Sequence, residues 1–161
     1  LVGAYSNGKR LDEQRTQTGN GAKRAEAWAI GSKYDANDIY LAATYAETRN
    51  LSMLDNSNTL FTNGKTKNLE VIAQYQFDFG LRPSISYVQS KGSHISTANG
   101  DVGNADLAKY ITTGTYYYFN KNFNVYADYR WNLLRSKQSE VTDGGWVGKD
   151  DNVTLGVTYQ F

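Results

Sequence analysis

Apolar and polar residues alternate along several stretches of this chain, which is the period expected of β-strands. Between positions 69 and 79, Leu, Val, Ala, Tyr, Phe and Phe occupy every second place, and mostly polar residues fill the gaps. The stretch 123–133 repeats this pattern. Successive side chains of a strand point to opposite faces. Each stretch therefore predicts a strand with one apolar and one polar face.

The same pattern predicts about eight strands along the whole chain, which we treat as one unit covering residues 1–161. The expected strands are 1–5, 25–34, 39–48, 68–78, 82–90, 107–119, 123–134 and 152–161. Tight turns are expected near 35–38, 79–81 and 120–122, and polar loops over 6–24, 49–67, 91–106 and 135–151. Strands of roughly 9–13 residues can cross a bilayer when they are tilted.

The last strand gives the strongest indication of where the apolar face lies. Its apolar side consists of Val153, Leu155, Val157, Tyr159 and Phe161. A soluble protein seldom leaves such a strand edge uncovered, because the edge would pair with other chains. In a transmembrane barrel, the last strand closes onto the first and its outer face meets lipid. The sequence therefore predicts an all-β protein, an antiparallel transmembrane β-barrel of the outer membrane.

Connection lengths and aromatic residues agree with this interpretation. Short turns alternate with long loops, as in bacterial outer-membrane barrels, whose short turns face the periplasm. Aromatic residues, among them Tyr34, Tyr40, Phe79 and Phe119, gather at the turn ends of the strands, where an interfacial girdle is expected. A soluble β-sandwich or lipocalin-like barrel would also alternate. It would leave the girdle and the terminal Phe161 unexplained.

Composition excludes several other classes of protein. Mean hydropathy is −0.61 with 20% charged residues, and no apolar run approaches the roughly 18–20 residues of a membrane helix. Without cysteine, disulfides and thiol catalysis are excluded, and the net charge of +1 gives no basic surface for nucleic acid. His94, the only histidine, lies in the predicted loop 91–106 without a second base or nucleophile. We therefore expect no enzyme, no metal site and no cofactor.

The polar face supplies the candidate functional residues. Because side chains alternate between the two faces of each strand, we expect all of these residues to point inward. Their mixture of carboxylate, amide, guanidinium and ammonium groups fits a water-filled lumen better than a packed interior. The candidates are Lys33, Glu70, Gln74, Asp78, Arg82, Tyr126, Asp128 and Arg130. Bracing of the barrel wall and tuning of ion preference are both open roles for these side chains.

Four segments closely resemble the enterobacterial general diffusion porins, which are trimeric outer-membrane channels of Gram-negative bacteria. They are Lys33–Ala43, Ala73–Ser84, Thr115–Asn122 and Val157–Phe161. The resemblance covers the chain from end to end, and these long motifs are specific. It implies a sixteen-stranded barrel for passive diffusion of small hydrophilic solutes, with strands 9–16 present here. It also implies a homotrimer in contact with lipopolysaccharide, outer-membrane lipid and the barrel-assembly machinery, which would engage the last strand.

The resemblance leaves one alternative open. The family's inward-folded constriction loop and the arginine cluster on the opposite wall have no counterpart in this sequence. The chain is therefore expected to be either part of a longer product or a small closed barrel. An eight-stranded barrel is filled by its own side chains and would conduct poorly. Such a barrel would instead display its loops to a phage, a colicin or another binding partner.

Overall fold

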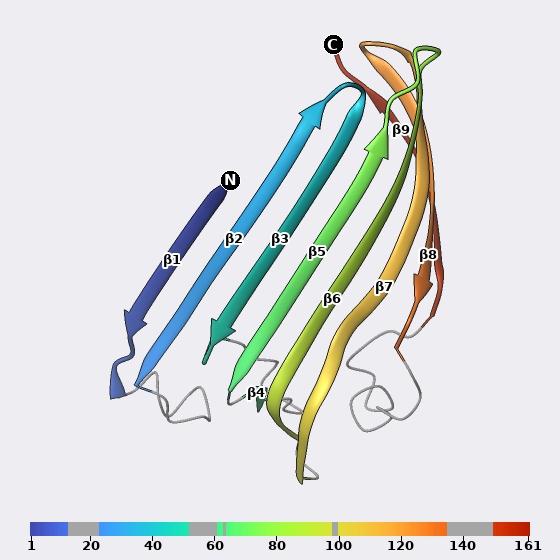
Figure 1. Ribbon diagram of the computed structural model, residues 1–161. Coiled ribbons are helices and arrows are strands. Elements are labelled where there is room, and N and C mark those ends of the chain that lie inside the picture. The colour runs from blue at the N-terminus through green and yellow to red at the C-terminus, as the bar shows by residue number, and fades with distance from the viewer. Residues whose placement is uncertain (13–22, 52–60, 63, 98–99, 135–149) are drawn as a thin grey trace.

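The computed structural model describes residues 1–12, 23–51, 61–62, 64–97, 100–134 and 150–161, which form one antiparallel sheet (Figure 1). The strands are β1 (Val2–Lys9), β2 (Arg24–Ala36), β3 (Ile39–Arg49), β4 (Phe61–Thr62), β5 (Lys65–Tyr75), β6 (Leu81–Thr97), β7 (Gly100–Asn120), β8 (Phe123–Asn132) and β9 (Asn152–Tyr159). Their order is β1-β2-β3-β5-β6-β7-β8-β9, and the two-residue β4 pairs with β6. The all-antiparallel architecture predicted from alternation is confirmed.

The pairing register carries the two faces of the strands continuously across the sheet. Directly opposed residues share a face, so one row can be followed from strand to strand. One row contains Lys33, Ala42, Ile72, Ser86, Thr112 and Arg130. The adjacent row on the other face contains Tyr34, Leu41, Ala73, Ile85, Thr113, Tyr129 and Val153. The predicted separation into a polar and an apolar face is therefore confirmed.

The described strands form a single layer, so no other described strand packs against its apolar face. Among the described residues, Ala105 is the one hydrophobic side chain that is buried. Ile85 is 53% exposed and Leu155 75% exposed, although both belong to the apolar face. A soluble β-sandwich would cover these side chains with a second sheet. The described part of the chain contains no helix long and apolar enough to cross a membrane.

The predicted tight turns form, and they lie together at one end of the sheet with the C-terminus (Figure 1). The β2–β3 turn has positive φ at both central residues, Asn37 (54°) and Asp38 (61°), as a two-residue type I′ hairpin requires. In the β5–β6 turn, Gly80 has φ 92°, and a Cβ there would collide with the Tyr118 carbonyl oxygen. That carbonyl approaches closely because the Tyr118 amide donates to the Gly80 carbonyl at 2.8 Å.

The predicted loop 91–106 is wrong. β6 continues to Thr97 and β7 starts at Gly100, so the two strands form an extended hairpin at the loop end, with His94 inside β6 (Figure 1). Backbone pairing persists here without apolar alternation, because strands that leave the bilayer have water on both faces and need no apolar side. Register shifts at Ser90/Lys91, Gly92/Ile95 and Ile95/Ser96 also hide the period. For the same reason β1 extends to Lys9, inside the predicted loop 6–24.

Further boundaries differ from the sequence prediction: β4 lies inside the predicted loop 49–67, β2 is longer than 25–34 at both ends, and β8 ends at Asn132 instead of 134. β5 covers Lys65–Tyr75 instead of 68–78, and β9 ends at Tyr159, two residues before Phe161. β1 and β9 each pair with one strand, β2 and β8, so the described strands form an open sheet with two free edges. The alternative of a small closed barrel requires β1 to pair with β9. That pairing is not found in the described strands.

Candidate functional site on the polar face

Seven of the eight candidate residues lie on one face of the sheet. Register places Lys33, Glu70, Gln74, Arg82, Tyr126, Asp128 and Arg130 there. One row close to the turn end contains Arg82, Tyr116, Tyr126 and Gly156. The next row contains Tyr40, Gln74, Ser84, Gly114, Asp128 and Thr154. Each row therefore aligns on one face residues that are distant in sequence, from Tyr40 to Thr154 in the second row.

Asp78 is the exception. β5 ends at Tyr75, so Asp78 lies in the exposed turn between β5 and β6. The turn is held by backbone hydrogen bonds, from the Phe77 amide to the Leu81 carbonyl at 2.8 Å and from the Gly80 amide to the Phe77 carbonyl at 3.0 Å. Alternation cannot be extended through a turn, so parity does not assign Asp78 to either face.

A tyrosine connects the two cations nearest the turn end. The Arg82 guanidinium carbon lies 5.7 Å from the centre of the Tyr40 ring, and the Lys33 Nζ lies 5.9 Å from it. Lys33 Nζ also lies 3.3 Å from the Asp35 carboxylate. The negative face of an aromatic ring attracts cations. Tyr40 therefore holds two positive charges on the polar face.

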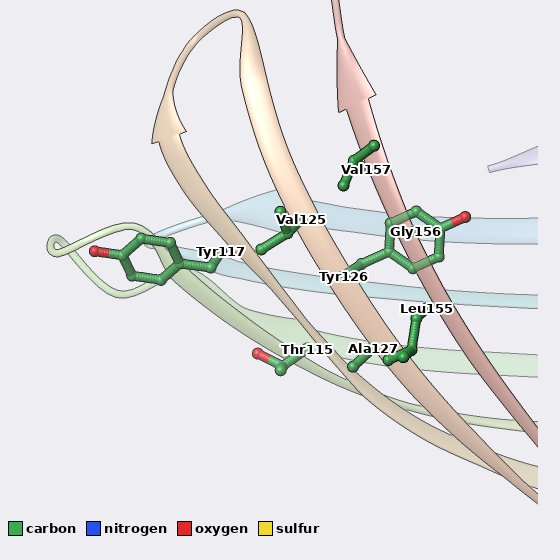
Figure 2. A pocket seen from close by; sticks show the side chains of 8 residues that line it. All are labelled: Thr115, Tyr117, Val125, Tyr126, Ala127, Leu155, Gly156 and Val157. Carbon is green, nitrogen blue, oxygen red and sulfur yellow. The ribbon is translucent and has the colours of Figure 1, made fainter.

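Glycines make room for two of the candidate side chains. The Tyr126 ring extends from β8 across the backbone of Gly156 on β9, where a Cβ would overlap the ring (Figure 2). The Asp128 carboxylate lies over Gly114 on β7 in the same way. Tyr126 also stacks on Tyr116, with ring centres 5.2 Å apart and planes 30° apart. These side chains lie against the sheet because glycine leaves no side chain beneath them.

Arg130 and Asp128 lie two residues apart on β8, but they do not pair with each other. The Arg130 guanidinium carbon lies 4.4 Å from the Tyr110 ring centre. No ion pair joins Arg130 to Asp128, although both are within the described part of the chain. Each charged group is therefore open to solvent or solute on its outer side.

Sequence reasoning missed the tyrosines of the polar face. Tyr110 and Tyr116 were not among the candidates, and Tyr40 was expected in the interfacial girdle, which is wrong. The alternation that places Gln74 and Asp128 on the polar face would have placed these tyrosines there too. Tyrosine was instead assigned to the girdle on the basis of its residue type alone. Aromatic contacts do gather at the turn end: Tyr117 meets Phe119 at 4.8 Å on the apolar face, and Phe77 and Phe79 of the β5–β6 turn stack at 5.2 Å.

The terminal strand β9 is the other set of candidate residues. Val153, Leu155 and Val157 are 64%, 75% and 72% exposed on the outer face. Leu155 and Val157 lie beside Ala127 and Val125 of β8 (Figure 2). Phe161 lies beyond the end of β9 and is fully exposed. Gln160 is fixed to the β7–β8 turn, because its carbonyl accepts from Asn122 Nδ2 at 2.7 Å. The end of the chain is therefore anchored and leaves an apolar edge uncovered.

The described residues also contain no group of three or more His, Cys, Asp or Glu side chains arranged to hold a metal ion. The residues that carry chemistry are therefore the charged and aromatic side chains of the polar face.

A model of the Gram-negative porin family matches residues 1–161, the whole chain. This chain belongs to the Gram-negative porin family. It is 57% identical over 163 residues to outer membrane porin F of Salmonella typhimurium and 49% identical over 161 residues to outer membrane porin PhoE of Escherichia coli K12. Each alignment covers 100% of this chain and 43% or 42% of the relative.

A solved structure of Salmonella typhi OmpF, in complex with daunomycin, superposes on this porin chain with a TM-score of 0.80. The two are 57% identical, and the match covers 99% of this chain and 45% of the other. The transmembrane β-barrel fold and the outer-membrane localisation predicted from the strands are thereby confirmed. This porin chain spans less than half of the length of these relatives.

Proposed function

We propose that this porin chain forms part of the wall of a water-filled channel through which small hydrophilic solutes and ions diffuse passively. The observation that supports this most directly is the face that carries charged and polar side chains on strands from β2 to β9, backed by an exposed apolar face. Charged groups without carboxylate or guanidinium partners, such as Arg82 and Asp128, require water on that side. The proposed role is transport without catalysis.

The open sheet supports a role as one section of a larger barrel. Free strand edges cannot face hydrocarbon, because their backbone N–H and C=O groups would lack partners. β1 and β9 therefore need further strands, which fits a chain that spans under half of its relatives' length. We propose that the complete barrel has sixteen strands and that Lys33, Glu70, Gln74, Arg82, Tyr126, Asp128 and Arg130 line its pore. For Asp78, a position at the periplasmic mouth is proposed.

Two measurements on the full-length porin test this function. In planar bilayers, we expect stepwise ion conductance, whereas a small binding barrel would give none above background. Spin labels at Asn124, Asp128 and Thr158 should be reached by aqueous quenchers, and labels at Val125, Ala127 and Val157 should sense lipid. The reverse accessibility would overturn the assignment of the two faces.

Lipopolysaccharide is a proposed partner of the outward face at the loop end. Lys67 and Lys91 are directly opposed there and both exposed, and like charges opposite each other are unfavourable. Glu47 lies opposite Lys67 and Asp106 lies opposite Lys91, but Glu47 already pairs with Lys65 at 3.2 Å and Asp106 accepts from Gln89 Nε2 at 3.0 Å. A phosphate between the two lysines would relieve the repulsion. Replacing both by Gln should lower co-purified lipopolysaccharide, and Lys121→Gln at the turn end is the matched control.

Three other partners are proposed with less support from the geometry. Assembly as a homotrimer would cover apolar area of the outward face, and crosslinking of the full-length porin tests it. Recognition of β9 by the barrel-assembly machinery fits its apolar edge, and deletion of Phe161 should then slow membrane insertion. Binding of a phage or a colicin would use the loop end, and resistance of cells without the porin would test that role.

A further inference from the structure

We infer that the turn end of the polar face contains a subsite for small aromatic anions, formed by Arg82 together with Tyr40 and Tyr116. This inference rests on the proposed function as a channel. It goes further, because it names a solute class and the side chains that would select it.

Arg82 supplies the positive charge of this subsite. Its guanidinium contacts the Tyr40 ring but has no hydrogen bond or ion pair to another described side chain or carbonyl. Guanidinium presents five N–H donors in a planar fork that matches a carboxylate. Lys33, by contrast, is paired with Asp35. Arg82 is therefore the cation at this end of the face whose donors are free for a solute.

Tyrosine rings beside Arg82 supply a flat aromatic surface. Tyr116 is directly opposite Arg82, so their Cβ atoms are about 4.5–5.5 Å apart by the geometry of cross-strand pairs. Tyr116 stacks on Tyr126 at 5.2 Å and lies 6.3 Å from the Tyr118 ring with planes 21° apart. Three rings thus extend side by side from the position of Arg82.

The backbone beneath these rings explains why they lie along the wall. Gly156 leaves room for Tyr126 to cross β9, so that this ring covers the sheet and does not project from it (Figure 2). Tyr116 and Tyr126 are only partly buried, which leaves ring surface open on the polar side. A planar solute can stack on that surface while its carboxylate reaches Arg82. A solute of equal charge without an aromatic ring gains only the contact between its carboxylate and Arg82.

The test compares two anions of nearly equal size and charge, benzoate and cyclohexanecarboxylate, as blockers of the KCl current through the full-length porin. We expect benzoate to block at the lower concentration. Arg82→Gln should raise the half-blocking concentration of both anions by about tenfold, as expected for the loss of a charge-assisted hydrogen bond. Tyr116→Leu should raise it about two- to fivefold for benzoate alone, since only the ring contact is lost.

The controls separate this inference from the proposed function. Arg130→Gln removes another cation of the same face. It should change the half-blocking concentrations of benzoate and of cyclohexanecarboxylate by no more than about twofold. The far-UV circular dichroism of each purified variant shows that it is folded, and each block is normalised to the unblocked KCl current of the same variant. If the wild-type porin does not conduct KCl, the proposed function fails. If it conducts but blocks equally with both anions, or if Arg82→Gln and Arg130→Gln have the same effect, the subsite is overturned.

Discussion

The two faces of the sheet are built from alternate residues of the same strands, but they depend on different interactions. On the apolar face, Ile85 and Leu155 are exposed and need only to meet hydrocarbon, which is a non-directional requirement. On the polar face, Tyr126 and Asp128 occupy positions that exist only because Gly156 and Gly114 lie beneath them. The comparison teaches that the outer face selects a class of residue, whereas the inner face selects individual residues.

The largest expected effect comes from placing a charge on adjacent positions of opposite faces. Val71 belongs to the apolar face and Ile72 to the polar face of β5. Val71→Arg should lower the free energy of unfolding by about 2–4 kcal/mol, because an arginine in hydrocarbon is costly. Ile72→Arg, on the polar face, should be much better tolerated. Urea titration of the full-length porin in lipid vesicles measures both, and equal losses would contradict the assignment of the faces.

A methyl group at Gly156 tests the fit of the polar face. Gly156→Ala would place its Cβ against the Tyr126 ring and should cost about 1–3 kcal/mol of unfolding free energy, typical of overpacking. Gly8→Ala is the matched control, since nothing lies within 4 Å of a Cβ there. In a Tyr126→Ala background the penalty of Gly156→Ala should disappear. A penalty that persists in that background would show that the ring is not its cause.

A smaller difference in stability is expected between replacements of two glutamates, one on each face of the sheet. Glu47 points outward at the loop end and is 8% exposed, accepts from the Tyr45 hydroxyl at 2.8 Å and pairs with Lys65. Glu47→Gln should destabilise the fold by about 1–2 kcal/mol, because a buried network loses its charged acceptor. Glu70, exposed on the polar face, should tolerate the same change within about 0.5 kcal/mol. Equal urea midpoints for the two variants would argue against the outward network.

The smallest expected effect is a local dependence on pH beside β9. The Asn132 backbone amide donates to Asp151 at 2.8 Å, which lowers the pKa of that carboxyl, and the Tyr129 hydroxyl adds a second hydrogen bond. A lowered folded pKa means that the stabilisation is complete above the ordinary pKa of about 4 and is lost as the pH falls through the folded value. Amide exchange at Asn132 should accelerate only in that acidic range. Asp151→Asn should remove the dependence, and an unchanged profile would exclude Asp151 as its source.

Sequence alone determined which residues share a face, because a strict period of two survives in any strand that has hydrocarbon on one side. That requirement fixed the polar candidates on β2, β5, β6 and β8, the tight turns and the outward side of β9. The prediction from alternation failed in segments where neither face of the strand meets hydrocarbon. Residues 91–97 and 100–106 remain paired with water on both sides, and Asp78 lies in a turn where parity has no meaning.

Only the tertiary structure decided which polar residues touch one another. Tyr40 lies between Lys33 and Arg82 because register places the four strands β2, β3, β5 and β6 side by side, although the sequence separates Lys33 from Arg82 by 49 positions. The glycines under Tyr126 and Asp128 lie on neighbouring strands and could not be matched to them from the sequence. Alternation is a property of one strand, whereas contact depends on the register between strands. The sequence therefore predicted which types of residue each face carries, but not which of those residues contact one another.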